Sequence, residues 1–599
     1  MSPQNNEFSL LVATVNGSGS QTANNTLLRA IFQMGIPVSG KNLFPSNIAG
    51  LPTWFMIRVS EKGYVARSRR MDVLVAMNPD TSVEDIAAMA PGSVILVSEG
   101  IPMPAIAEDR TMYRIPFHKL VEPLVSDVKL RKLVVNMIYV GILSHVLGIE
   151  EAEVDKALQA QLGRKVKALE MNRAAVKAGA EYARKHLDRA PVQVERRTKT
   201  AGKILIEGNQ AAALGALFGG VTFVAWYPIT PSSSLAESLQ GYLERYRRDP
   251  VTRKATFSVV QAEDEIAAIG MVLGASWAGA RAMTGTSGPG LSLMTEFTGY
   301  GYYAEIPAVI WDVQRVGPST GLPTRTSQGD LLMAAHLSHG DTKHIVLLPS
   351  TVEDCYEMGM KAFDLAERFQ TPVLVLSDLD LGMNVWMSDP FRYPDKPWDR
   401  GKVLSAEDLE RLGGFERYRD VDGDGIPYRT LPGTPHPRAG YFTRGTGHDE
   451  AAHYTESAQV YARTMDRLAR KYETARGAVP RPVVDPVAGA EIGLIAYGST
   501  HWAMVEARDR LAAEGCKTGY LLLKALPFTK EMRTFLETHR SIYVVEQNRD
   551  GQLASLLKME YPDLAGRIRS ILHYDGWPID AEPVLEGIRS ATREEVTIR

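Results

Sequence analysis

Two short segments in the middle of the chain carry residue types that can build a cofactor pocket. The first reads Tyr-Pro-Ile-Thr-Pro-Ser-Ser-Ser from Tyr227 to Ser234, and the second reads Gln-Ala-Glu-Asp-Glu from Gln261 to Glu265. The prolines stiffen the first loop. Glu263 follows an apolar strand and precedes a helix of small residues, and ligands bind at such edges of parallel sheets.

The residues after Glu263 favour a binding role over a purely structural one. A lone carboxylate at a helix start only offsets the helix dipole, which is worth about 0.3–1 kcal/mol. Here the helix carries Gly270, Gly274 and Gly279, which allow close packing. Thr-Ser-Gly-Pro-Gly from Thr286 to Gly290 then lets the backbone approach a ligand. This order of elements resembles the pyrimidine-binding domain of thiamine diphosphate enzymes. The resemblance implies that Glu263 bonds the aminopyrimidine and assists proton removal from the thiazolium carbon.

Three motifs narrow the resemblance to one family. The Tyr227 loop, Gln261-Ala-Glu263 and Arg315-Val-Gly-Pro-Ser-Thr320 are similar to the α subunit of the 2-oxoacid:ferredoxin oxidoreductases. The resemblance implies that Thr230 and Arg315 are catalytic and contact the 2-oxoacid, with Thr320 beside them and with Tyr227 and Pro228 next to the cofactor. An arginine can clamp the substrate carboxylate with two hydrogen bonds, while a threonine hydroxyl orients the ketone. The alternative for Arg315 is a surface ion pair, which would contribute little to folding stability.

The length of 599 residues is too great for one core, and we predict a multidomain α/β protein. Residues 1–190 resemble the family's γ domain, here fused ahead of α, and 191–202 form a linker. Residues 203–385 form the thiamine pyrimidine-binding domain, and 386–488 an extended insertion and connector. Residues 489–599 resemble the transketolase C-terminal domain.

A glycine-rich loop in the first domain is a candidate coenzyme A contact. It runs from Gly17 to Gln21 at a strand-to-helix junction, where backbone N–H groups can receive a phosphate. Ser18 and Ser20 replace glycines that are common in the family pattern. Arg58 and the arginines at 67, 69 and 70 follow in sequence; the equally weighted alternative is a solvated basic face.

Half of a thiamine site is missing from the sequence. Gly423-Asp424-Gly425 resembles the start of the magnesium and diphosphate signature, but no asparagine occurs between Asn384 and Asn548. The same loop has Leu431 where an EF-hand needs a glutamate, so a polar turn is the better interpretation. The two cysteines cannot hold an iron–sulfur cluster, which usually needs four thiolates. We therefore predict no metal ligands here and a separate β subunit that supplies Mg²⁺, the diphosphate site and a 4Fe-4S cluster.

The resemblance implies a coenzyme A-dependent oxidative decarboxylation of a 2-oxoacid to an acyl-CoA and CO₂, and this reaction is reversible. It also implies an (αβ)₂ assembly that passes the electrons to ferredoxin. The stretch from Phe442 to His448 resembles α subunits acting on 2-oxoglutarate, whose product is succinyl-CoA. Its distal carboxylate needs a second cation, from His336, His339, Lys343 or the β subunit. The alternatives are a pyruvate or branched-chain oxoacid enzyme, a non-redox thiamine enzyme component, and a non-catalytic regulatory protein that binds coenzyme A or a nucleotide.

Composition restricts the partners and the compartment. Hydrophobic residues make up 45% and charged residues 23% of the chain, and the net charge is −3. This balance gives no electrostatic case for nucleic acid or an anionic membrane. The N-terminus shows no export signal, and the apolar segment from Ala211 to Trp226 is interrupted by glycines. We predict a cytoplasmic enzyme that neither enters a membrane nor binds nucleic acid.

Overall fold

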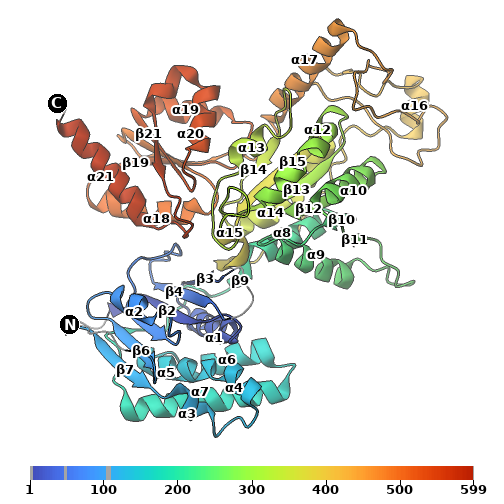
Figure 1. Ribbon diagram of the computed structural model, residues 1–599. Coiled ribbons are helices and arrows are strands. Elements are labelled where there is room, and N and C mark those ends of the chain that lie inside the picture. The colour runs from blue at the N-terminus through green and yellow to red at the C-terminus, as the bar shows by residue number, and fades with distance from the viewer. Residues whose placement is uncertain (1–3, 46–49, 103–108, 598–599) are drawn as a thin grey trace. The chain divides into compact units, whose positions relative to one another are not determined.

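The computed structural model describes residues 4–45, 50–102 and 109–597, which form two compact units (Figure 1). The first unit comprises Met1–Ile206, Asn384–Pro390 and Pro578–Glu582. The second comprises Glu207–Met383, Phe391–Trp577 and Pro583–Arg599. Both units are mixed α/β, so the predicted fold class is confirmed.

The first unit is built on a sheet with the strand order β7-β6-β5-β2-β4-β3-β16-β9. Its strands are β2 (Glu7–Val15), β3 (Val38–Leu43), β4 (Pro52–Ser60), β5 (Val73–Ala76), β6 (Val94–Ser98), β7 (Thr111–Ile115), β9 (Ile204–Glu207) and β16 (Val385–Ser388). The strands predicted at Phe8–Thr14, Val73–Ala76 and Val94–Val97 are confirmed. The fully buried β5 and β6 pair in parallel, as expected for apolar strands covered on both faces.

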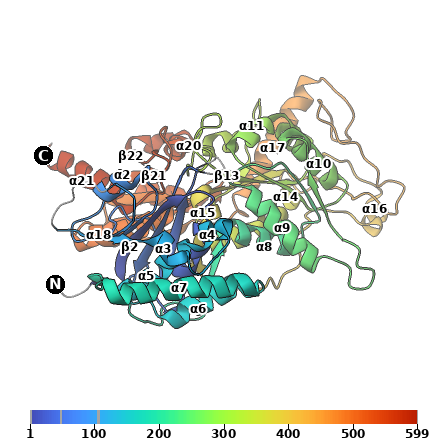
Figure 2. The same cartoon turned by 60° about the horizontal axis from the view of Figure 1, so that its bottom comes forward.

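Helices cover this sheet: α1 (Ser20–Gln33), α2 (Ser82–Ala87), α3 (Phe117–Val121), α4 (Val128–Val134), α5 (Asn136–Leu147), α6 (Glu151–Leu162) and α7 (Val166–His186). The charged stretch over 152–187 predicts one surface helix, and the structure has two helices there. The helix is broken between α6 and α7, which pack side by side (Figures 1 and 2). The α7 helix also buries a small-residue face against α5, where a Cβ on Gly141 would lie 1.9 Å from the Val176 carbonyl oxygen.

The segment Val128–Leu147 is long and apolar enough to cross a membrane by length and composition, and 72% of it is buried inside the protein.

The second unit has a sheet with the order β11-β10-β12-β13-β15-β14-β20. Its strands are β10 (Phe223–Trp226), β11 (Ser258–Gln261), β12 (Ala282–Thr286), β13 (Ala308–Gln314), β14 (Ile345–Leu347), β15 (Pro372–Asp378) and β20 (Ala525–Leu526). All pairings are parallel except β14 with β20. The connecting helices are α8 (Gly208–Phe218), α9 (Ser233–Tyr246), α10 (Glu265–Trp277), α11 (Gly288–Leu293), α12 (Thr295–Tyr303), α13 (Leu331–Ala335), α14 (Val352–Phe369) and α15 (Leu379–Met383).

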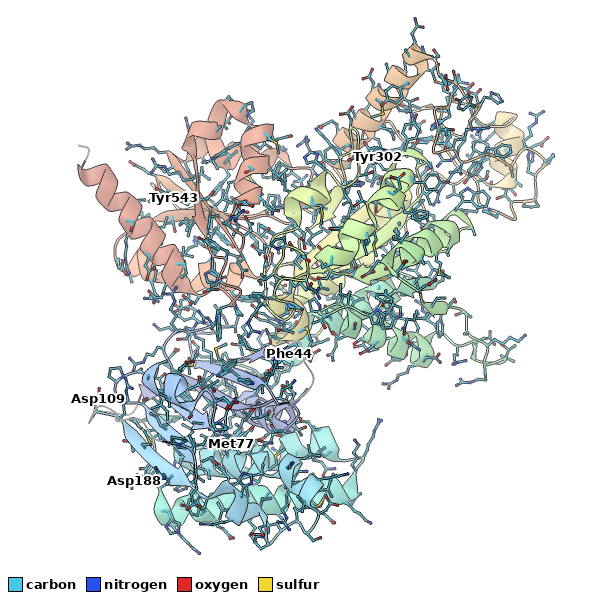
Figure 3. The ribbon with its side chains drawn as sticks, viewed as in Figure 1. Phe44, Met77, Asp109, Asp188, Tyr302 and Tyr543 are labelled. Carbon is cyan, nitrogen blue, oxygen red and sulfur yellow. The ribbon has the colours of Figure 1, made fainter. Side chains whose placement is uncertain are left out.

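A further sheet closes the second unit, with the order β17-β19-β18-β21-β22. Its strands are β17 (Val483–Asp485), β18 (Ile492–Ala496), β19 (Thr518–Leu522), β21 (Ser541–Glu546) and β22 (Ile568–Leu572). Its helices are α18 (Thr500–Ala513), α19 (Lys530–Thr538), α20 (Gln552–Glu560) and α21 (Ala581–Thr597). Tyr543 marks β21 in Figure 3. Part of the predicted connector before this sheet is therefore the edge strand β17.

Along the chain, a long and mostly irregular stretch separates β16 from β17. It carries two helices, α16 (Ala406–Leu412) and α17 (Ala458–Ala475). Its Gly423-Asp424-Gly425 segment is a turn: Asp420 accepts hydrogen bonds from the backbone N–H groups of Gly423 (2.9 Å) and Gly425 (3.0 Å). Asp424 forms an ion pair with Lys402. The interpretation of this segment as a polar turn is confirmed.

Candidate functional site

The central sheet of the second unit has a topological switch point between β10 and β12. From β10 the chain crosses to β11 on one side, and from β11 it returns to β12 on the other side. In parallel sheets ligands bind in the crevice outside the carboxyl ends of the strands at such a point. The Tyr227 loop, Glu263, the Ser287 turn and Arg315 all begin at this edge, because each directly follows one of the strands β10 to β13.

Hydrogen bonds to neighbouring side chains hold the Tyr227–Ser234 loop. The Asn209 side-chain amide donates to the Pro231 carbonyl oxygen (2.9 Å) and to Ser234 Oγ (2.8 Å). The Ile229 N–H donates to Ser233 Oγ (3.0 Å). The loop therefore presents a half-buried Thr230 from a fixed backbone, while Tyr227 and Pro228 are exposed at its start.

Arg315 lies against this loop. Its side chain leaves the end of β13, is 7% exposed and donates from Nη1 to the Thr230 carbonyl oxygen at 2.7 Å. Burial lowers the pKa of Arg315, and the nearby charges of Asp330 and Glu265 act in the opposite direction. Nε is buried without a hydrogen-bond partner in the part of the chain that the structure describes. The structure thus brings Thr230 and Arg315 together, as a shared substrate site requires.

Two glutamates stand at the start of α10, and their environments differ. Glu263 is exposed, whereas Glu265 is 8% exposed and is the first helical residue. Asp264 between them caps the helix by accepting a hydrogen bond from the Ala267 N–H at 2.7 Å. Sequence reasoning selected Glu263 and passed over Glu265. The sequence gives no signal for this choice, because the two glutamates flank the same capping residue and differ only in burial.

The Ser287–Gly290 turn packs directly on two carboxylates. A Cβ on Gly290 would lie 2.1 Å from Thr286 Oγ1 and 2.9 Å from Glu265 Oε1. A Cβ on Gly288 would lie 2.7 Å from Asp330 Oδ2. A side chain at Gly290 would therefore displace Thr286 Oγ1 and Glu265, and one at Gly288 would displace the Asp330 carboxylate.

Thr320 and the histidine candidates are placed differently. Thr320 is exposed in the loop closed by the bridge between Val316 and Leu322. The prediction that His336, His339 or Lys343 approaches the substrate was wrong. These residues precede β14, which runs parallel to β13 through β15, so they lie at the sheet edge opposite Arg315. Tyr302 marks that edge at the end of α12 in Figure 3.

The coenzyme A candidates belong to the first unit. Thr14 Oγ1 donates to Ser20 Oγ at 2.9 Å, and the Asn136 side chain donates to the Ser18 carbonyl oxygen at 2.6 Å. The α1 helix begins after Gly19, whose φ of 80° suits glycine, and has no side-chain cap. Arg58 donates to the Ala66 carbonyl oxygen at 2.9 Å. The neighbouring Arg67 and Arg69 instead bind Asp580, at 2.8 and 3.0 Å.

Comparison with known proteins identifies the family. The family model described as pyruvate flavodoxin/ferredoxin oxidoreductase, thiamine diphosphate-binding, matches residues 214–387, and that described as pyruvate ferredoxin/flavodoxin oxidoreductase matches residues 9–182. The alpha subunit of 2-oxoacid:ferredoxin oxidoreductase 1 from Aeropyrum pernix is 31% identical over 98% of this chain and 97% of its own length. The chain belongs to the 2-oxoacid:ferredoxin oxidoreductase alpha subunits.

Two further similarities place this oxidoreductase subunit among its relatives. The 2-oxoglutarate synthase subunit KorA of Methanothermobacter thermautotrophicus is 36% identical over 57% of this chain and 87% of its own length. The structure of 2-oxoglutarate:ferredoxin oxidoreductase from Magnetococcus marinus, with 2-oxoglutarate, coenzyme A and succinyl-CoA bound, matches with a TM-score of 0.88. That similarity has 29% identity and covers 98% of this chain and 99% of that chain.

The residues of the crevice fit the aminopyrimidine end of thiamine diphosphate. The thiamine-binding family model spans the strands and turns around the switch point. Buried polar atoms there lack partners among the described residues, including Thr284 Oγ1, Ser287 Oγ and Arg315 Nε. Such atoms in a crevice are expected to meet a ligand or ordered water. The described residues hold no group of three or more His, Cys, Asp or Glu side chains that could bind a metal ion.

Proposed function

We propose that this alpha subunit acts on 2-oxoglutarate, in a coenzyme A-dependent oxidative decarboxylation to succinyl-CoA and CO₂ that passes electrons to ferredoxin and runs in both directions. The observation that carries the proposal is the match, along nearly the whole chain, to the Magnetococcus marinus structure with 2-oxoglutarate, coenzyme A and succinyl-CoA bound. The paired Thr230 and Arg315 give it a chemical basis.

Arg315 receives the 1-carboxylate of the substrate in this proposal. Its Nη1 is fixed by the Thr230 carbonyl, and its Nε is available to a carboxylate oxygen. Charge-assisted hydrogen bonds from a guanidinium to a carboxylate are short and about twice as strong as neutral ones. The Thr230 hydroxyl is placed to orient the adjacent ketone, with Thr320, Tyr227 and Pro228 bordering the site.

The carboxylate that bonds the aminopyrimidine is that of Glu265 or of Glu263, and the geometry supports Glu265. A buried carboxylate is shielded from water, so its interaction with a bound base is stronger than that of an exposed one. Glu265 also lies near Arg315 and packs on the Gly290 turn. Thiamine diphosphate, when bound, supplies the nucleophilic carbon, and the glutamate holds the ring tautomer that accepts its proton.

An exposed apolar surface on the second unit is an argument for a partner subunit. It consists of side chains on α10 and the two helices that follow, all at least 37% exposed: Ile266, Met271, Trp277, Leu293, Phe297 and Tyr300. We call this surface the α10–α12 face; Figure 1 labels α10 and α12, the helices that carry most of it. Large exposed apolar patches mark interaction sites, and α10 begins at the crevice itself. We place here the β subunit that supplies Mg²⁺, the diphosphate site and the 4Fe-4S cluster, in an (αβ)₂ assembly.

Coenzyme A is assigned to the first unit in the same proposal. The uncapped start of α1 and the Gly17–Gln21 loop, with Ser18 and Ser20, offer backbone N–H groups to a phosphate or a pantetheine amide. Arg58 is the proposed cation. The proposal also keeps the predicted division of the chain into domains. These are the γ domain at 1–190, the linker at 191–202, the pyrimidine-binding domain at 203–385, the insertion and connector at 386–488, and the C-terminal domain at 489–599.

A pair of matched variants tests the thiamine assignment. The assembled oxidoreductase is prepared with Glu265→Gln and, separately, with Glu263→Gln, and 2-oxoglutarate-dependent dye reduction is measured with thiamine diphosphate and coenzyme A present. We expect Glu265→Gln to lose activity by about a hundredfold or more, and Glu263→Gln to retain most of it. The reverse order would return the role to Glu263, and full activity of both variants would refute the site.

Substrate identity is tested separately, because the matched family models are described by pyruvate. The ratio kcat/KM is compared for 2-oxoglutarate, pyruvate and a branched-chain 2-oxoacid with the same enzyme. The proposal requires the highest value for 2-oxoglutarate. A higher value for pyruvate would reassign the substrate and leave the site intact.

A further inference from the structure

A second pair of carboxyl groups lies beneath the candidate site and has no assigned role. Asp312 sits in the middle of the buried strand β13, between Trp311 and Val313. It is 0% exposed, and neither carboxyl oxygen accepts a hydrogen bond from an amide, hydroxyl or cationic donor within the described residues. A carboxyl group in such a position is costly unless it is neutral or paired.

Its neighbour is Asp330, the residue before α13. The Asp330 N–H donates to the Gln314 side-chain oxygen at 3.1 Å, which ties the residue to the end of β13. Asp330 Oδ2 is buried without a donor among the described residues, and its carboxyl group is hydrogen-bonded to that of Asp312. Because two ionised carboxylates cannot form that bond, one of them must carry a proton.

Charge and burial indicate which carboxyl group ionises. Burial raises the pKa of Asp330 to about 6, while the hydrogen bond from Asp312 and the charge of Arg315 act against that rise. Burial and the charge of Asp330 raise the pKa of Asp312 well above its ordinary value. At neutral pH the pair therefore holds one proton, on Asp312, and one negative charge, on Asp330.

The titratable groups around the pair come from four elements. Arg315 follows β13 and carries the positive charge, and Glu265 approaches from α10. Asp378 ends β15, next to β13. Tyr497 follows β18, and its pKa is raised by burial and by the charges of Glu546, Asp378 and Asp330. Asp330 also packs on Gly288, in the turn whose Gly290 contacts Glu265.

We propose that Asp312 and Asp330 share one proton and act together as positioning residues, with anionic Asp330 holding the Arg315 guanidinium and the Gly288–Gly290 turn in place for substrate binding. This inference rests on the proposed function where it gives Arg315 the substrate carboxylate. The proton-sharing part does not depend on the substrate: it rests on the burial of the two carboxyl groups, on the lack of other donors to them, and on the hydrogen bond between them.

The two asparagine variants separate the roles of the pair. An asparagine at 312 mimics the protonated carboxyl group, because its amide can donate to Asp330. Asp312→Asn should therefore keep the charge beside Arg315 and should raise KM for the oxoacid less than Asp330→Asn does. Asp330→Asn moves the charge to Asp312, away from Arg315, and should raise KM by about tenfold or more with a smaller change in kcat.

Infrared difference spectroscopy on the assembled oxidoreductase tests proton sharing without requiring activity. At pH 7 the spectrum of the wild type minus that of Asp312→Asn should show the absorption of a protonated carboxyl group, which shifts in heavy water. The exposed Asp550→Asn serves as control and should show no such band. Absence of the band from the Asp312 difference spectrum would overturn proton sharing.

The positioning role is tested by steady-state kinetics on the same preparations, after co-purification and thermal unfolding show that they are folded. Unchanged KM in Asp330→Asn, or equal increases in both asparagine variants, would overturn positioning by Asp330. If Asp330→Asn fails to fold, Asp330→Ser gives the same comparison. If the wild type turns over none of the oxoacids, the proposed function fails, while the infrared result still decides whether the proton is shared.

Discussion

At the scale of single residues, the proposed substrate site depends most on Arg315. It is buried, one of its nitrogens is held by the Thr230 carbonyl, and another has no partner in the described structure. We expect Arg315→Gln to raise KM for the 2-oxoacid by about 30-fold or more, since truncating one partner of a buried charge pair costs about 2–5 kcal/mol. Steady-state kinetics of the assembled enzyme checks this.

The matched control is Arg245→Gln on the last turn of α9, away from the crevice. It should leave KM unchanged. Equal KM values for Arg315→Gln and wild type would remove Arg315 from the substrate site.

The Asp312–Asp330 pair also predicts a pH dependence of stability. Because the pKa of Asp330 is raised from 3.8 to about 6, the folded chain binds this proton more tightly than the unfolded chain between those values. The stability contributed by the proton is complete at low pH and declines as pH rises through this interval. Asp312→Asn removes the carboxyl group that keeps its proton in the folded chain and ionises in the unfolded chain, so the decline should be smaller. Urea midpoints from pH 4 to 7 measure it; parallel curves for the variant and wild type would contradict it.

Sequence alone predicted part of the residue-scale picture. The motif order predicted Thr230 and Arg315 as neighbours, and the structure brings them together; their catalytic roles remain predictions. The choice between Glu263 and Glu265 depended on which side chain is buried. The sequence does not reveal this, because both glutamates lie next to Asp264 in one acidic run. In the sequence, Asp312 was noticeable only as a single charge at the end of an apolar run, and nothing marked Asp330 as its neighbour. Their contact joins two separate segments, so it appears only in the folded structure.

At the scale of elements, α17 shows why some helices escape sequence analysis. Its buried positions are Arg467, Leu468, Lys471 and Ala475, so two of the four carry a charge and would be assigned to the solvent-facing side from sequence alone. These cations face Glu305 at the end of α12, with Lys471 Nζ 2.8 Å and Arg467 Nη1 3.2 Å from Oε2. The two cations hold the pKa of Glu305 at about 2 despite its burial.

This cluster predicts a large loss of stability on removing the shared anion. Glu305→Gln leaves Arg467 and Lys471 buried without a counter-charge, which costs about 3–5 kcal/mol. Thermal and urea unfolding of the purified chain measure the change. The control is Glu181→Gln, in the exposed pair with Lys177, which should cost less than about 1 kcal/mol. Similar losses in both variants would show that the buried cluster is not a stabilising contact.

The regular elements themselves were well predicted. Apolar runs gave most of the strands, because buried parallel strands read as continuous hydrophobic segments. The break between α6 and α7 was missed because both helices share similar periodicity. The edge strand β17 was read as a connector, since its flanking prolines dominate the local composition.

At the scale of the whole molecule, the proposed β-subunit contact on the α10–α12 face would link assembly to the candidate active site. Ile266 on this face is 41% exposed and lies one residue after Glu265. We expect Ile266→Asp to leave the chain folded but to weaken its association with the β subunit by about tenfold or more, because a charge is placed in an apolar contact. Analytical ultracentrifugation of the mixed subunits measures this.

Val251→Asp is the control, since Val251 is 88% exposed at the tip of a loop outside that face. It should assemble as the wild type does. Unimpaired assembly of Ile266→Asp would mean that the partner binds elsewhere.

The most direct test of the account is reconstitution from separately purified subunits. The alpha chain is mixed with its β subunit, thiamine diphosphate, Mg²⁺, coenzyme A and 2-oxoglutarate, and ferredoxin reduction and succinyl-CoA formation are followed together. The account predicts both products with the two subunits, neither with the alpha chain alone, and neither with Glu265→Gln. Succinyl-CoA formation by the alpha chain alone, or by the Glu265→Gln assembly at the wild-type rate, would contradict a thiamine site divided between the subunits and centred on Glu265.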